Sequence, residues 1–281
     1  MPTVEIDRRA FIASLGGAAA VALMTSEQKA DALEAYMEQS LDEGVAQAAQ
    51  GGQAPKYPTM AEIEEQNAKR SGVRRGAGSI FNASGRDGQP RGLLAKMSDR
   101  PTVLEFFEKR FAPANHVLQS ATRALKTGMP EEIIFACLMH DTVHALVKVD
   151  HGWWGAQIVE PYVSEKVTFA IRHHQTLRFY PDDKYGYEYP EMYLNLFGED
   201  YKPELYLEQN YKWVRNHKWY EMPRLVTVND LYSFDPNQKV SIDPFVDIIG
   251  RQFKQPKEGI GYDNSPVAHM WRTMMFPDRP L

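Results

Sequence analysis

The sequence has very little cysteine: Cys137 is the single one among 281 residues. One cysteine cannot form an intramolecular disulfide, so a disulfide framework is excluded as the source of stability. Cys137 lies in the apolar run that precedes His140, and we expect it to be a small buried core residue.

Long apolar runs, excess positive charge and alternating patterns are also missing. No stretch of 18 or more apolar residues occurs, which excludes a conventional membrane-spanning helix. The net charge of -5 and the pI of about 5.9 offer nothing to a phosphate backbone, so no nucleic-acid partner is expected. Apolar residues do not alternate with period two over a useful length, so no strands are expected in the core.

The N-terminus has the pattern of a targeting segment. Arg8 and Arg9 precede Phe11 and a short run rich in alanine, glycine, leucine and valine, which resembles a twin-arginine export signal. The run from 10 to 24 is too short to span a bilayer. We therefore expect residues 1–25 to be an export leader and the protein to be periplasmic, with an amphipathic or disordered cytoplasmic leader as the alternative.

Two segments follow before the main domain. Residues 26–50 are rich in helix formers and predict a helix outside the main core, and GGQAPKYP at 51–58 breaks it. We assign 26–60 to a helix and linker and 61–281 to one helical domain. Basic residues among glycines and serines in 69–91 indicate a solvated basic loop, with an anion-binding loop as the alternative.

The main domain is predicted to be all-α. Apolar residues recur at helical spacing, and prolines, Asn115 and Ser164 supply the starts of helices. An aromatic-rich insertion occupies 179–220, and the tail beyond 249 is expected to be irregular. The predicted helices cover 101–110, 115–127, 130–141, 152–163, 164–178, 224–234 and 240–249.

Histidines are concentrated in one part of this domain, where six of the eight lie between His116 and His174. His140 and Asp141 are adjacent and directly follow an apolar helix. Imidazoles with carboxylates suit iron, manganese or zinc, and a carboxylate can bridge two ions. Hydrogen-bonded core histidines are the alternative, but burying so many ionisable groups without a metal would be costly. The candidate ligands are His116, His140, Asp141, His151, His174 and Asp230.

The order of these residues, H…HD…H…H…D, resembles the HD-domain superfamily. Many of its members are metal-dependent phosphohydrolases, and a smaller branch comprises mixed-valence diiron oxygenases that include inositol oxygenase and the phosphonate-cleaving dioxygenases. Three details are similar to the oxygenase branch: HVLQSA beginning at His116, the HDTVH form that adds His144, and Arg178 followed by Phe179-Tyr180 after His174.

The resemblance implies an HD-type helical bundle with two irons. His116, His140 and Asp230 would hold one iron, His151 and His174 the other, and Asp141 would bridge them. His144 remains a rival of His151 as a ligand, and His173 remains a rival of His174. The alternative metals are manganese and zinc.

The resemblance also implies an oxygenase that uses O2 to oxidise or cleave a small hydroxylated, anionic substrate. His144 and Arg178 would contact that substrate. Arg178 lies four residues after His174, on the same helical face, where its guanidinium can meet an anion. A phosphohydrolase with the same ligands is the alternative, but no lysine or arginine closely follows His140-Asp141 to hold a phosphate. The oligomeric state is not indicated.

Overall fold

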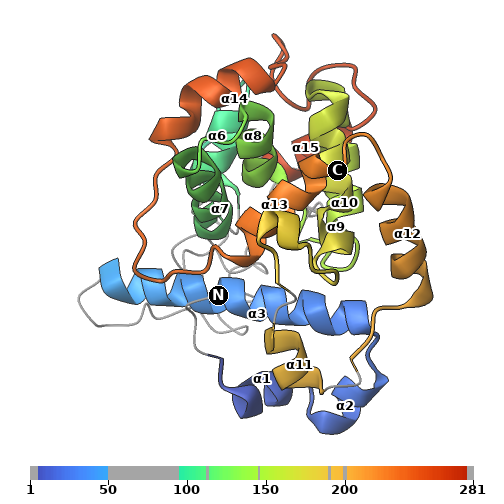
Figure 1. The fold of residues 1–281 in the computed structure, drawn as a ribbon. Helices are drawn as coiled ribbons and strands as arrows, with labels where there is room; N and C mark the ends of the chain where they lie inside the picture. Colours follow the sequence, from blue (N-terminus) through green and yellow to red (C-terminus); the bar gives the residue numbers. More distant parts are fainter. Residues whose placement is uncertain are drawn as a thin grey trace.

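The computed structural model describes residues 6–49, 95–111, 114–144, 146–188, 191–198 and 201–276. These residues form α-helices, short 3-10 helices and loops, and they contain no strand; an isolated bridge joins Asp182 and Tyr187. The predicted all-α class is confirmed (Figure 1). The expected domain boundary near residue 60 and the basic loop at 69–91 lie outside the described residues.

Five helices form the bundle that carries the candidate ligands. α10 packs against α13, α9 and α8, and α7 packs against both α8 and α13 (Figure 1). Their apolar faces share one continuous core. The helices are α7 (Ala114–Lys126), α8 (Glu131–Met139), α9 (His151–Val159), α10 (Glu165–Leu177) and α13 (Glu221–Leu231).

Local sequence signals explain where these helices start. The Ser164 hydroxyl accepts a hydrogen bond from the Val167 amide at 3.3 Å, so the predicted N-cap of α10 is confirmed. Pro130 directly precedes α8, as predicted. Asn115 is not a cap: it lies inside the first turn of α7, and its side-chain amide donates to Asp42 Oδ1 at 2.9 Å.

The described apolar side chains of helix α3 (Ser26–Ala49) lie outside the main core, as predicted, but they are buried in an apolar cluster of their own. The helix runs along one end of the bundle, between the bundle and the pair formed by α1 (Arg8–Ser14) and α11 (Glu191–Phe197) (Figure 1). Leu33, Met37 and Leu41 are buried in a second apolar cluster that also contains Phe179 and Phe234. The helix is thus held by hydrophobic burial, and its other face is turned towards the candidate ligands.

The remaining helices lie around the five-helix bundle and α3. The tail beyond 249 is more regular than predicted, because it contains α15, whose Trp271 is fully buried in the main core. None of the described helices is long and apolar enough to cross a membrane. Export and periplasmic location stay predictions. The helices are α1 (Arg8–Ser14), α2 (Ala18–Leu23), α6 (Val103–Lys109), α11 (Glu191–Phe197), α12 (Leu205–Arg215), α14 (Val246–Gln252) and α15 (Ala268–Met275).

Candidate metal centre

The six predicted ligands meet in the interior, at the ends of the five bundle helices. His116 lies in the first turn of α7, and His140 follows α8 directly with Asp141 beside it. His151 begins α9. His174 lies in the last turn of α10, and Asp230 lies near the end of α13. Each of the six side chains is at most 2% exposed.

The loop between Asp141 and His151 is short. The chain turns at the end of this loop, where one residue has the left-handed backbone conformation. Asp150 precedes α9 with a φ of 57°, and it is the one non-glycine residue of the described chain with a positive φ. Aspartate tolerates this conformation better than most residues do. The turn brings His151 back towards Asp141, where their side chains meet.

Four of the histidines are oriented by the backbone. In each ring Nδ1 lies within hydrogen-bonding distance of a carbonyl oxygen, so Nδ1 carries a hydrogen and Nε2 is turned towards the centre. An imidazole held in this way binds a metal through Nε2 when Nε2 carries no proton. The pairs are His116 with Ser233 at 3.1 Å, His140 with Cys137 at 2.8 Å, His151 with Lys148 at 2.9 Å and His174 with Ile171 at 2.6 Å.

Asp141 lies between two groups of Nε2 atoms. Its Oδ2 is 3.3 Å from His140 Nε2 and 3.7 Å from His116 Nε2, while its Oδ1 is 3.1 Å from His151 Nε2. Asp230 Oδ1 joins the first group, 2.9 Å from His116 Nε2. In the second group, the Nε2 atoms of His151 and His174 are 3.2 Å apart. Each oxygen of Asp141 therefore faces a different group.

This donor set fits bound cations. His140 Nε2 and both carboxylate oxygens of Asp141 have no hydrogen-bond partner among the described residues. Burial disfavours charge on His140, yet the carboxylates of Asp141 and Asp230 raise its pKa to about 10. Burial lowers the pKa of His174 to about 3, which keeps this ring neutral. The carboxylates thus attract positive charge, and the neutral imidazoles present lone pairs to it.

His144 also lies at the centre but is held differently from the other rings. Its Nδ1 is 2.7 Å from Glu38 Oε2, and its Nε2 has no hydrogen-bond partner in the part of the chain that the structure describes. The rings of His144 and His151 are 4.5 Å apart. His151 rather than His144 faces Asp141 Oδ1, which leaves His144 beside the second group with one free nitrogen.

His173 points away from the centre, although it neighbours His174 in sequence. Its ring lies 4.6 Å from that of Phe169 and 5.2 Å from that of Trp213. These aromatic residues belong to a separate surface between α10 and α12. The structure brings His174 and not His173 to the candidate ligands.

Arg178 is buried one turn beyond His174, and its guanidinium is already paired. Its Nη1 donates to Glu34 Oε2 at 2.8 Å, and its Nη2 forms a short ion pair with Asp31. The helical register with His174 is as expected. Two carboxylates from α3 nevertheless occupy the position that the sequence suggested for a substrate anion.

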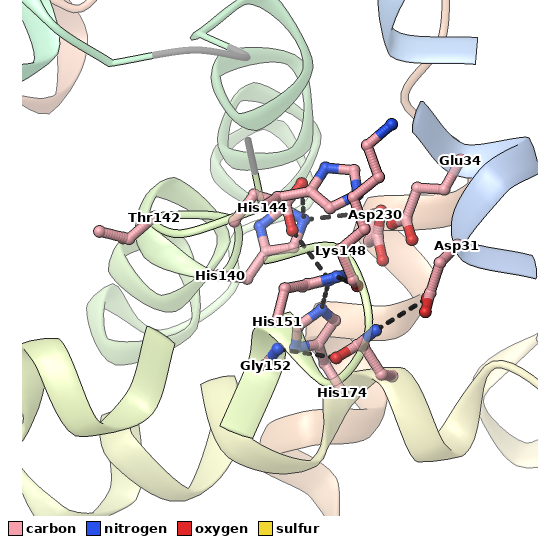
Figure 2. Close-up of polar contacts among 12 residues, drawn as sticks. Asp31, Glu34, His140, Thr142, His144, Lys148, His151, Gly152, His174 and Asp230 are labelled. Carbon is pink, nitrogen blue, oxygen red and sulfur yellow. Dashed lines mark hydrogen bonds and ion pairs between the residues drawn. The ribbon is translucent and has the colours of Figure 1, made fainter. Parts of the chain in front are cut away.

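The acidic face of α3 is the part of the site that sequence reasoning missed. Glu27, Asp31, Glu34 and Glu38 are spaced by four, three and four residues, so they share one helical face, and each is at most 6% exposed. Figure 2 shows Asp31 and Glu34 extending from α3 towards the histidines. The spacing was the available signal, but such a stripe on a helix usually faces solvent.

Two of these carboxylates can take part in metal binding. An oxygen of Glu34 lies within 4.8 Å of ring nitrogens of His144 and His151. An oxygen of Glu38 lies within the same distance of a carboxylate oxygen of Asp141 and a ring nitrogen of His144. Glu34 Oε1 and Glu38 Oε1 have no hydrogen-bond partner among the described residues. The α3 face thus closes the centre on the side opposite the bundle.

Gly152 is required by the close approach of α9 to α10. A Cβ at this position would lie 2.7 Å from the carbonyl oxygen of Ile171 and 2.9 Å from His174 Cε1, whereas at Gly155 the nearest atom would be 3.5 Å away. We expect Gly152→Ala to displace His174 and to lower the metal content, measured by elemental analysis. Gly155→Ala is the matched control and should keep its metal; equal metal contents in both variants would contradict the close packing.

Comparison with known proteins gives one distant relationship. No family model matches the chain. A [1-hydroxy-2-(trimethylamino)ethyl]phosphonate dioxygenase (glycine-betaine-forming) from Leisingera caerulea is 31% identical over 99 residues, which cover 31% of this chain and 50% of that enzyme. The chain thus spans about half the length of the curated relative it matches. The chain has a distant homologue that is a dioxygenase, which supports an oxygenase in general, and it contains buried groups that could bind metal.

Proposed function

We propose that the protein is a diiron oxygenase that uses O2 to oxidise or cleave a small hydroxylated substrate. The observation that carries this proposal is the placement of Asp141, whose two oxygens face two separate groups of imidazole Nε2 atoms. A carboxylate in this position can bridge two metal ions. His116, His140 and Asp230 would hold one iron, and His151 and His174 would hold the other.

The chemistry requires both the metals and the buried surroundings. If bound, the two irons would activate O2 for reduction by the substrate and would acidify a substrate hydroxyl. The chain contributes a site that excludes water, since the ligands and the α3 carboxylates are almost fully buried. His144, held through Nδ1 by Glu38, has Nε2 free to hold or accept a proton beside the second group.

The distant relative supports the reaction class more than the substrate. Its name describes a dioxygenase whose substrate carries a hydroxyl group next to a phosphonate. The hydroxylated substrate in our proposal agrees with that name. Because the match covers half of the relative, our proposal names a hydroxylated substrate and not that particular phosphonate.

Metal analysis after anaerobic purification tests the proposed function. We expect about two irons per chain, because Asp141 faces two groups of ligands. The partly reduced protein should show the electron paramagnetic resonance signal of a mixed-valence iron pair. A single manganese or zinc ion, together with hydrolysis of phosphoesters, would instead support the phosphohydrolase alternative.

A further inference from the structure

The pairing of Arg178 with α3 is built into the site and is not a loose surface contact. Asp31 Oδ1 accepts from Arg178 Nη2 and also from Gln175 Nε2 at 3.1 Å. The other side-chain atom of Gln175, Oε1, accepts from the Gly152 amide at 2.7 Å. Two side chains at the end of α10 therefore fix Asp31, and one of them, Gln175, is bonded to the first turn of α9, next to His151.

Carboxyl groups make up most of the buried polar side chains on this side of the site. Glu27, Asp31, Glu34 and Glu38 of α3 face the interior, and Arg178 is the guanidinium that pairs with two of them. One oxygen on each of the four carboxylates has no hydrogen-bond donor among the described residues, and Arg178 Nε has no acceptor there. These free oxygens can accept hydrogen bonds, so they suit hydroxyl or ammonium groups better than an anion.

An anionic substrate group at Arg178 would have to displace carboxylates that cannot reach water. Asp31 and Glu34 are 1% and 3% exposed, so losing the guanidinium would leave each as an uncompensated buried acid. The planar guanidinium already uses two of its N–H groups on these acids. Both effects oppose the binding of a phosphonate or carboxylate at this position.

We propose that Asp31 and Glu34 determine the substrate charge of this site, so that it takes a neutral or cationic hydroxylated compound and rejects an anionic one. The inference rests on the proposed function, because it assumes that a small alcohol binds beside the metal centre. The substrate charge that we infer is the opposite of the anionic one that Arg178 alone suggests. Asp31 and Glu34 act as specificity-determining residues through their hold on Arg178.

Binding of methylphosphonate, measured by isothermal titration calorimetry on the full chain, tests this inference. The wild-type protein and Arg178→Gln should bind it equally weakly or not at all, because the guanidinium is occupied. The double variant Asp31→Asn/Glu34→Gln should bind about tenfold more tightly or better, because it frees the guanidinium. Glu43→Gln, at an exposed position of the same helix, is the matched control and should behave as wild type.

Two results would overturn the inference. One is a wild-type affinity for methylphosphonate that Arg178→Gln weakens, and the other is a folded double variant that gains no affinity. If the double variant does not fold, Glu34→Gln alone should show a smaller gain, and its failure to do so would count against the inference.

The outcome is separable from that of the proposed function, which is judged by iron content and O2 uptake. A protein without iron that still gains anion binding in the double variant would keep the inference and lose the function. A diiron protein that turns over an anionic alcohol bound by Arg178 would support the proposed function and contradict the inference.

Discussion

Replacing Asp141 with alanine should remove both metal ions and abolish turnover. One oxygen of Asp141 faces His116 and His140, and the other faces His151, so the substitution removes a ligand from both groups at once. Burial opposes charge on this carboxylate, but the surrounding histidines, chiefly His140 and His151, hold its pKa well below the usual range. Asp141 is therefore already ionised before a metal binds, as metal binding requires.

Elemental analysis and O2 uptake of the purified variant measure this effect. Asp230→Ala should lower the metal content less than Asp141→Ala does, because Asp230 lies near His116 and His140 and belongs to one group alone. Asp247→Ala, at an exposed position of α14, should retain full metal content and serves as the control. Wild-type metal content in Asp141→Ala would refute the whole ligand set.

The bundle and the convergence of the six candidate ligands could be predicted from sequence because the relevant signals are local. The apolar helix before His140 marks a buried helix end, and Ser164 marks the start of α10. A histidine at the end of such a helix has few places to point except the interior. The order of the ligands along the chain then indicates which ends meet.

The acidic face of α3 could not be predicted in the same way. A row of glutamates and aspartates at helical spacing usually lies in water, and its local sequence does not distinguish a solvated face from one turned to a metal centre. What decides is tertiary packing, because the apolar face of α3 is covered by Phe179 and Phe234 and leaves the acids facing inwards. The partners of Arg178 could not be inferred for the same reason, since they are more than 140 positions away.

Arg178→Met should destabilise the fold far more than the same change at Arg172, six residues earlier on α10. Arg178 is 1% exposed and pairs with Asp31 and Glu34, which are equally buried as side chains. Removing one partner of a buried ion pair costs about 3–5 kcal/mol, because it leaves an uncompensated charge. Arg172 and Glu160 form an exposed pair at 3.4 Å, with side chains 28% and 55% exposed, and such pairs contribute about 0–1 kcal/mol.

Urea denaturation of the two variants measures the difference in the free energy of unfolding. Adding Asp31→Asn and Glu34→Gln to Arg178→Met should restore part of the lost stability, because it removes the charges that the substitution left unpaired. That recovery would distinguish loss of the ion pairs from simple loss of packing, since the packing defect remains in the triple variant. Arg178→Met and Arg172→Met could instead lower the free energy of unfolding equally. The carboxylates of α3 would then not depend on Arg178, and this result would contradict their role in setting the substrate charge.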